Sequence, residues 1–176
     1  MFMSNAQESK KSVRDGILDK IENFITMGYG KKEDLRALDK SLRDQYYVDL
    51  IALRHRWEKV YLDVLEAGQT TVSRECKKVI QTLDRVAATV NRADYGYAPL
   101  LDRVDKIQEQ ALNRVLEYDK TLANNLIQLS KDIDAAEASL TEAAWPKLKE
   151  NIDILKKNLE NLSEGLRKRK QAMSGS

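Results

Sequence analysis

Residues 148–166 read LKENIDILKKNLENLSEGL, and this stretch decides the fold class. Large aliphatic side chains recur in it at steps of four, three, four, three and four residues, at Leu148, Ile152, Leu155, Leu159, Leu162 and Leu166. Residues with this spacing lie along one side of an α-helix, and the seven-residue repeat is typical of helices that pack side by side. The stretch therefore predicts an amphipathic helix over about residues 146–170.

Four further segments have apolar residues at helical spacing, over about residues 10–27, 32–67, 70–94 and 99–140. Their stripes are Val13, Ile17, Ile21 and Phe24, then Leu35, Leu38, Leu42, Tyr46, Leu50, Leu53, Trp57, Val60 and Val64, then Val72, Cys76, Val79, Leu83, Val86, Val90 and Ala93, then Val104, Ile107, Ala111, Val115, Tyr118, Leu122, Leu126, Leu129, Ile133, Ala136 and Leu140. No segment alternates apolar and polar residues as a half-buried strand does. We therefore predict an all-α fold, an elongated antiparallel helical bundle or coiled coil of three to five helices.

Turn signals separate these helical segments. The clearest is Asp94-Tyr95-Gly96-Tyr97-Ala98-Pro99, which predicts a turn near residues 95–98. Gly68 precedes Thr70 and Thr71, either of which would suit a helix N-cap, and Ser139 and Glu142 have the spacing of a capping box. We predict one helical domain over residues 10–170, with disordered ends at residues 1–9 and 171–176.

Two architectures fit this pattern. If Gly68 and Pro146 break the chain, several helices form an elongated bundle. If they only kink it, residues 32–95 and 99–170 form one long hairpin that turns near residue 97. Such a hairpin has little core of its own and would need a partner chain to cover its apolar stripe. We expect the bundle, with the kinked hairpin as the alternative.

Composition restricts the function more than it defines it. The formal net charge is only +2, and nucleic-acid binders usually carry a clear basic excess, so we do not expect nucleic acid as a partner. Cys76 is the only cysteine, which excludes an internal disulfide and any zinc site of several cysteines. The longest apolar run, at residues 50–53, is far shorter than the roughly 20 residues of a membrane span. We expect a cytoplasmic protein, with attachment to a membrane surface as the alternative.

No arrangement of residues predicts catalysis, a cofactor, a metal or a small-molecule substrate. His55 is the only histidine, and it is followed by Arg56 and lacks the glycine that usually follows the histidine of a phosphotransfer domain. An ordinary surface histidine is the simpler interpretation, and a phosphotransfer bundle remains the enzymatic alternative. Cys76 lies on an apolar stripe, where a cysteine usually behaves as a small buried hydrophobe. We therefore expect a protein that is not an enzyme.

Three groups of residues are candidates for an interaction surface. Tyr95 and Tyr97 sit at the predicted turn, where tyrosines can contact a partner or plug the end of the helices. The basic run Arg167, Lys168, Arg169 and Lys170 suits either an acidic neighbouring helix or an anionic membrane. The amphipathic segment with Ile17, Ile21 and Phe24 would pack on the other helices or lie on lipid.

Three functions follow from these features. The first is a non-enzymatic helical scaffold or interaction protein that binds a partner protein or associates with itself through unused apolar stripe. The second is a peripheral membrane protein that touches anionic lipid through its first helix and its basic C-terminal run. The third is the phosphotransfer bundle that uses His55.

Overall fold

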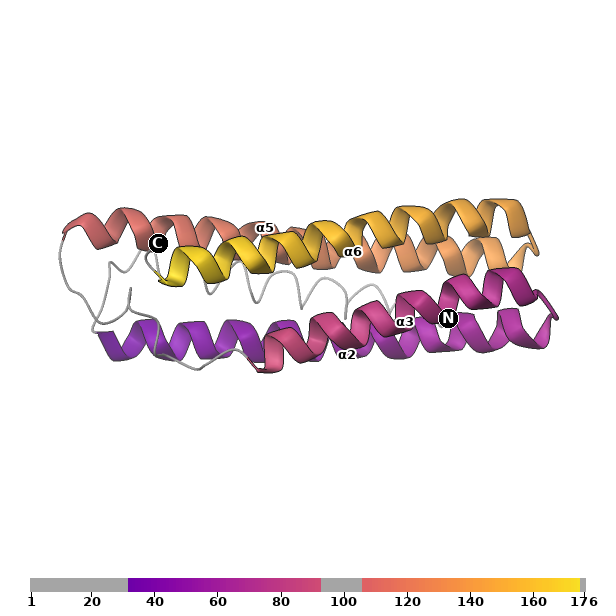
Figure 1. Ribbon diagram of the computed structural model, residues 1–176, viewed down its shortest axis with the longest axis horizontal. Coiled ribbons are helices and arrows are strands. Elements are labelled where there is room, and N and C mark those ends of the chain that lie inside the picture. Colours follow the sequence, from indigo (N-terminus) through magenta and orange to yellow (C-terminus); the bar gives the residue numbers. More distant parts are fainter. Residues whose placement is uncertain (1–31, 93–105, 175–176) are drawn as a thin grey trace, which may run out of the picture. The chain divides into compact units, whose positions relative to one another are not determined.

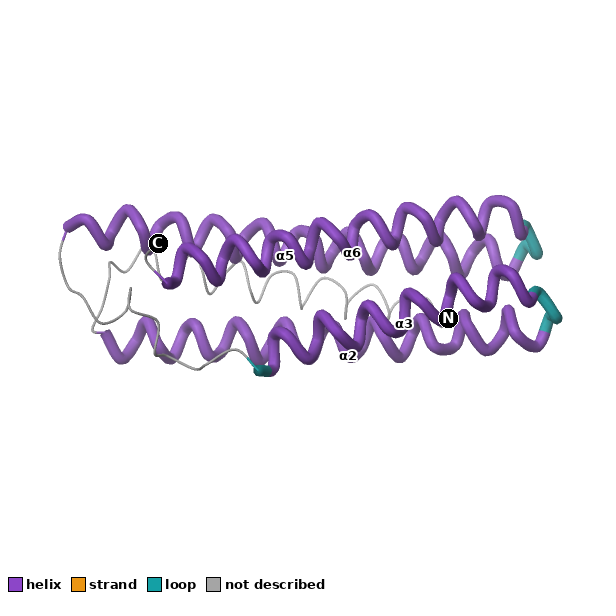
Figure 2. Tube along the Cα trace, viewed as in Figure 1, coloured by secondary structure: helices purple, strands orange, loops and turns teal. Residues whose placement is uncertain are grey.

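The computed structural model describes the backbone of residues 32–92 and 106–174, and the side chains of residues 36–92 and 113–174. These residues form four helices and no strand, as Figures 1 and 2 show: α2 (Lys32–Glu66), α3 (Thr70–Asn91), α5 (Lys106–Thr141) and α6 (Trp145–Ser174). The helices pack against each other, which confirms the all-α class.

The chain divides into two compact units, and three of the helices contribute to both of them. Unit 1 comprises Met1–Gln45, Asp94–Asn124 and Gly165–Ser176, and unit 2 comprises Tyr46–Ala93 and Asn125–Glu164. Unit 2 contains all of the described parts of α3 and both tight turns.

In unit 2, the turn between α2 and α3 is built on Gly68, whose φ of 72° lies in the left-handed region. The amide of Gln69 donates to the carbonyl of Val64, and the amide of Gly68 donates to that of Leu65. These two bonds form a Schellman motif, which satisfies the last carbonyls of α2. The carbonyl of Gln69 then accepts the first hydrogen bond of α3, from the amide of Ser73. Figure 2 shows this turn between two helical segments.

The turn between α5 and α6 repeats this motif without a glycine. Ala143 takes the left-handed position, with a φ of 53°. The amide of Ala144 donates to the carbonyl of Ser139, and the amide of Ala143 donates to that of Leu140. Pro146 is the second residue of α6, where a missing N–H costs the helix nothing. Only a few residues thus join α2 to α3 and α5 to α6.

These turns contradict one of the two predicted architectures. The kinked long hairpin is wrong, because α2 ends at Glu66 and α5 ends at Thr141. The predicted caps are also wrong. Gln69, whose side chain makes no capping hydrogen bond, is the N-cap of α3 in place of either threonine. The Ser139 hydroxyl donates to the carbonyl of Ala135 within α5 and caps nothing.

Hydrogen bonds across the second turn show that α5 and α6 run antiparallel in unit 2. The Asn151 amide donates to the Ser139 hydroxyl over 2.8 Å, and the Asn158 amide donates to Asp132 over 2.6 Å. From the first bond to the second, the residue number rises in α6 and falls in α5, so the two helices run in opposite directions. Residues 147–170 hold eight basic and four acidic residues, and residues 99–140 hold five basic and eight acidic ones, so the sequence predicts that these segments are neighbours.

The core of unit 2 is the set of apolar stripes that the spacing predicts. Leu148, Ile152, Leu155 and Leu159 of α6 are fully buried, and the stripe positions of α2 and α3 are buried with them. Trp57 is the largest of these side chains, and its indole N–H donates to the carbonyl of Cys76 in α3 over 2.9 Å. That bond satisfies the one polar atom that a buried tryptophan brings into the core.

In unit 1, α6 continues to Ser174, past the predicted helix end at residue 170. Met173 is buried, and its burial offers the physical reason for the longer helix, in place of the tail expected over residues 171–176. The predicted disordered start, the segment 10–27 and the turn near 95–98 lie outside the described residues. The single domain expected over residues 10–170 stays a prediction.

Candidate interaction surfaces

Four charged side chains lie buried together in unit 1. The Arg169 guanidinium of α6 donates from Nε to Asp119 Oδ1 of α5 over 2.6 Å, and from Nη2 to Asp39 Oδ1 of α2 over 2.5 Å. Arg43 Nη2 lies 2.7 Å from Asp39 Oδ2. Asp119 is only 1% exposed and Arg169 only 7%. We call these four residues the buried quartet; its two arginines and two aspartates balance in charge.

Electrostatics keep Arg169 charged in this interior. Burial by itself would lower the pKa of Arg169, but the charges of Asp119 and Asp39 and the hydrogen bonds to them outweigh it and raise that pKa. A buried charge tolerates the loss of water only when partners of this kind surround it. The quartet thus pins α2, α5 and α6 to one another in unit 1.

The four residues of the basic run of α6 differ in their burial. Arg169 belongs to the interior and not to an exposed surface, whereas Arg167, Lys168 and Lys170 are exposed. Outside the quartet, the described part of unit 1 carries seven basic and two acidic side chains. The basic ones are Arg36, Lys40, Arg114, Lys120, Arg167, Lys168 and Lys170, and the acidic ones are Asp44 and Glu117. The described surface of this unit is therefore basic.

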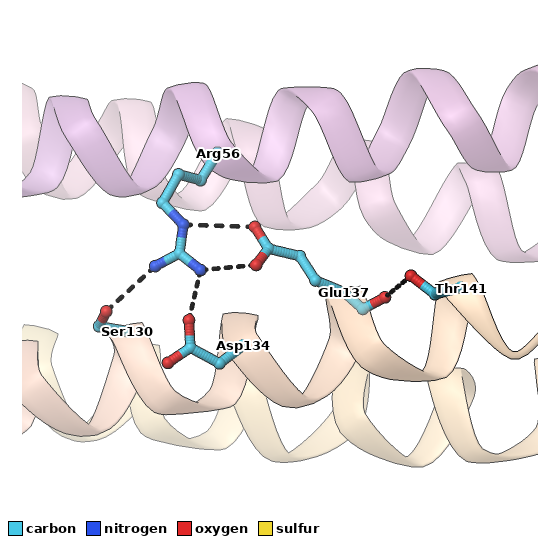
Figure 3. Close-up of polar contacts among 5 residues, drawn as sticks. All are labelled: Arg56, Ser130, Asp134, Glu137 and Thr141. Atoms are coloured by element: carbon cyan, nitrogen blue, oxygen red, sulfur yellow. Dashed lines mark hydrogen bonds and ion pairs between the residues drawn. The ribbon is translucent and has the colours of Figure 1, made fainter. Parts of the chain in front are cut away.

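In unit 2, Arg56 joins α2 to α5 (Figure 3). Its guanidinium donates from Nη2 to Asp134 over 2.6 Å, from Nη2 and Nε to the two carboxylate oxygens of Glu137, and from Nη1 to the Ser130 hydroxyl. Burial alone would lower the pKa of Arg56, and the bonds to Glu137 and Asp134 reverse that shift and raise it. This fork is partly open to solvent and fixes the spacing of two helices.

The face of α2 that points away from the core carries a second heptad row in unit 2. Its steps are three, four, three, four and three residues, through Val48, Ile51, His55, Glu58, Leu62 and Leu65. We call this row the outer seam. Val48, Leu62 and Leu65 are 58%, 52% and 50% exposed, and they are three of the four large apolar side chains that the described residues expose to this degree. One helix thus has apolar positions on two opposite sides, which a helix with a single packing face does not have.

The centre of the outer seam is polar. His55 is exposed, and its Nδ1 lies 3.8 Å from Glu58 Oε2, which also accepts a 2.7 Å hydrogen bond from Arg54. Arg54 reaches α3 as well, through a 2.9 Å bond to Asp84. Among the described residues, Oε1 of Glu58 accepts no hydrogen bond. The only histidine of the sequence therefore sits on an outward face of α2, beside Glu58.

Cys76 lies in the core of unit 2 and takes no part in a surface. Burial raises the pKa of its thiol to about 12, so the reactive thiolate form is suppressed. The described residues contain no group of three or more histidine, cysteine, aspartate or glutamate side chains arranged to hold a metal ion. None of the four described helices has the length and apolar character that crossing a membrane requires.

The remaining predicted surface residues, Tyr95, Tyr97, Ile17, Ile21 and Phe24, lie outside the described residues. The outer seam was not predicted, because it uses other positions of the same helix than the single stripe expected along residues 32–67. The buried quartet was not predicted either, although Asp39, Asp119 and Arg169 lie at heptad spacing, three residues from Leu42, Leu122 and Leu166. An aspartate at such a position, opposite a basic run elsewhere in the chain, is the signal that was available.

Comparisons of the chain with protein-family models, with curated proteins and with solved structures give no match.

Proposed function

We propose that this chain is a non-enzymatic helical interaction protein that binds another α-helix along the outer seam of α2. The observation that carries the proposal is the row of exposed apolar side chains at heptad spacing, with Val48, Leu62 and Leu65 at least half exposed. Heptad rows are the surfaces through which helices dock on helices. The protein acts as a scaffold or adaptor that presents this row.

The framework of unit 2 supports this role by holding α2 in place from its other sides. Trp57 anchors α2 to α3, and Arg56 ties it to α5 through Asp134 and Glu137. A binding surface on a rigid element loses little conformational entropy when a partner docks. The outer seam is thus carried by a helix whose rotation about its own axis is fixed.

A photo-crosslinking residue at position 62 tests this function in the cell. We expect crosslinks from position 62 and few from position 154, because Ile154 is 51% exposed but lies on α6, away from the outer seam. The crosslinked protein is then purified, and its direct binding should be lost with Leu62→Glu and kept with Ile154→Glu. Equal labelling at both positions, or reconstituted binding that ignores Leu62→Glu, would refute the function.

The finer architecture, an antiparallel helical bundle or coiled coil, is part of the same proposal. The tight turns at Gly68 and Ala143, and the antiparallel course of α5 and α6 in unit 2, support it. Small-angle X-ray scattering tests it directly. A distance distribution that fits two unconnected compact bodies would contradict a continuous bundle.

A second candidate function, binding to an anionic membrane surface, is favoured by one observation. In the described part of unit 1, exposed basic residues such as Arg167, Lys168 and Lys170 outnumber acidic ones. We expect the chain to co-sediment with phosphatidylserine vesicles and not with phosphatidylcholine vesicles, and the double variant Lys168→Gln/Lys170→Gln to pellet less. Lys147→Gln/Lys149→Gln, two exposed lysines of unit 2, is the matched control. Equal pelleting with both lipids, or equal losses in the two variants, would exclude this function.

A further inference from the structure

The outer seam reads the same in both directions along α2. Its steps of three, four, three, four and three residues are symmetric about a centre between His55 and Glu58. When two copies of the helix lie antiparallel about that centre, Val48 meets Leu65 and Ile51 meets Leu62. The six positions of one copy then coincide with the six positions of the other. An interface of this kind is self-complementary, as a two-fold dimer requires.

The chemistry at the centre of the row has the same symmetry. In the antiparallel pairing, His55 of each copy meets Glu58 of the other. The imidazole N–H of each histidine can then donate a hydrogen bond to a carboxylate. A parallel pairing in register would place His55 on His55 and Glu58 on Glu58, which sets two carboxylates against each other. Charge complementarity thus favours the antiparallel arrangement.

Contacts within the chain leave these central groups available. Arg54 and His55 both approach Oε2 of Glu58, and Oε1 of Glu58 accepts no hydrogen bond from the described residues. The His55 side chain is 65% exposed. Arg54 is oriented by Asp84 of α3, so it fixes the Glu58 carboxylate beside the seam. A second copy can therefore add its bonds without breaking those already present.

We propose that the occupant of the outer seam is a second copy of this chain, docked antiparallel through α2 with His55 of each copy against Glu58 of the other. This inference rests on the proposed function and names its partner. Apolar pairs flank a polar centre on both sides. The polar centre sets the register, since a shift by one heptad would place His55 or Glu58 against an apolar residue.

The length of the row sets the strength of this dimer. From Val48 to Leu65 the seam spans about 26 Å at 1.5 Å per residue. A single pair of helices over this length lies at the small end of specific interfaces, which corresponds to a reversible dimer. We expect monomer and dimer to exchange at micromolar concentrations of the chain.

Analytical ultracentrifugation of the full chain at about 1 to 200 µM tests the pairing, a range that covers the affinity of a small interface. We expect Leu62→Glu to raise the dimer dissociation constant about 100-fold, because each dimer loses two apolar contacts and gains two carboxylates. Ile154→Glu is the matched control and should leave the constant unchanged. A chain that stays monomeric throughout, or a dimer equally sensitive to both substitutions, overturns the inference.

A charge exchange tests the centre of the row. His55→Glu places four carboxylates together and should weaken the dimer about tenfold, as like charges at an interface do. His55→Glu/Glu58→His restores an opposed pair at the same two positions and should recover the affinity. Circular dichroism checks that both variants keep the helical content of the native chain. A double variant no tighter than the single one overturns the pairing of His55 with Glu58.

Disulfide trapping tests the direction. An equimolar mixture of Ile51→Cys and Leu62→Cys chains should form a mixed disulfide under mild oxidation. Leu62→Cys alone should not, since its two cysteines would lie 11 residues apart along the pair, about 16 Å. Native Cys76 stays in place because it is buried. Efficient trapping of Leu62→Cys alone overturns the antiparallel arrangement.

These outcomes separate the inference from the function on which it rests. If the chain is monomeric but position 62 crosslinks to another helical protein whose binding needs Leu62, the helix-binding function stands and the self-pairing fails. If position 62 crosslinks to nothing and the chain is monomeric, both fail.

Discussion

Replacing Asp119 with asparagine is expected to destabilise the protein more than any other Asp→Asn substitution in the described part of α5. Asp119 is 1% exposed and accepts two hydrogen bonds from Arg169, over 2.6 and 3.2 Å. Asparagine keeps the shape of the side chain and removes its charge. Arg169 then retains only the carboxylate of Asp39, which it shares with Arg43.

The magnitude follows from the charge balance of the buried quartet. Two arginines and two aspartates sum to zero, and Asp119→Asn removes one of the two negative charges that face the arginines in the interior of unit 1. Removing one partner of a buried pair typically costs about 3–5 kcal/mol. The matched control is Asp134→Asn on the same helix, whose carboxylate also binds an arginine over 2.6 Å but is 38% exposed. A surface pair of that kind contributes about 0–1 kcal/mol.

Urea unfolding followed by far-ultraviolet circular dichroism measures the difference. With an ordinary dependence on urea of about 1–3 kcal/mol per molar, Asp119→Asn should lower the midpoint by about 1 M or more and Asp134→Asn by much less. Tryptophan fluorescence is a second probe, because Trp57 and Trp145 both belong to unit 2. A fluorescence transition that stays in place while the circular dichroism transition moves would show that unit 1 unfolds by itself.

Two results would refute this reasoning. One is a loss for Asp119→Asn that equals the loss for Asp134→Asn. The other concerns Asp119→Leu/Arg169→Met, which removes one opposite-charge pair and leaves Asp39 and Arg43 as a neutral pair. Apolar replacement of a buried ion pair is often neutral or stabilising, so this double variant should be more stable than Asp119→Asn. A double variant that is less stable would mean that packing, and not charge, dominates at this position.

Three further outcomes follow from the turns, an ion pair and the buried thiol. Gly68→Ala should lower the free energy of unfolding by about 1 kcal/mol, because alanine must take a positive φ there. Ala143→Gly should raise it by up to about 1 kcal/mol, because glycine relieves the same strain. Thermal midpoints that move in the same direction for both variants would contradict the account of the turns. The hydrogen bond from Lys156 lowers the pKa of Glu75 from 4.5 to about 2, so the ionised carboxylate contributes stability that is present above pH 4.5 and is lost as the pH falls toward 2. The stability difference between the native chain and Glu75→Gln should therefore shrink over that interval in acid titrations of unfolding, and a difference that grows there would contradict the assignment. Cys76, with its pKa raised to about 12, should react with a thiol reagent only in denaturant, and rapid modification of the folded chain would contradict its burial.

Much of the core could be predicted from spacing alone. Leu148, Ile152, Leu155 and Leu159 are buried as the heptad repeat predicts, because a helix has only one side to turn toward its neighbours at those positions. The all-α class could also be predicted from this spacing, and Pro146 marked the region where α5 and α6 separate. Leu140, by contrast, lies at the end of its stripe and is only half-buried.

The second turn was harder to predict than the first, since it has no glycine at its left-handed position. Ala143 takes a left-handed conformation although alanine carries no preference for it, so no local signal marks the position. The capping-box spacing of Ser139 and Glu142 indicated a helix start that does not form at Ser139, since α6 begins at Trp145. Ser139 bonds back within α5 because the Schellman motif already terminates that helix.

The charged groups were predictable only in part. Arg169 lies within a basic run, and the heptad steps of α6 continue from Leu166 to Arg169 and Met173, so spacing distinguishes Arg169 from Lys168 and Lys170. Its burial depends on Asp119 and Asp39, which lie 50 and 130 residues away along the chain. The spacing indicates which member of the charge cluster turns inward, but periodicity does not identify the distant carboxylates that compensate its charge.

The two tight turns of unit 2 have a consequence for the order in which the chain folds. Bonds inside each hairpin join residues close in sequence, such as Ser139 and Asn151, 12 apart. Bonds between the hairpins span far more, 81 residues for Glu75 and Lys156. Closing short loops costs less entropy than closing long ones, so each hairpin should nucleate before the two join. As the chain leaves the ribosome, α2 and α3 can pair while α5 is still being synthesised. Their apolar stripes then stay exposed to water until α5 and α6 pack against them.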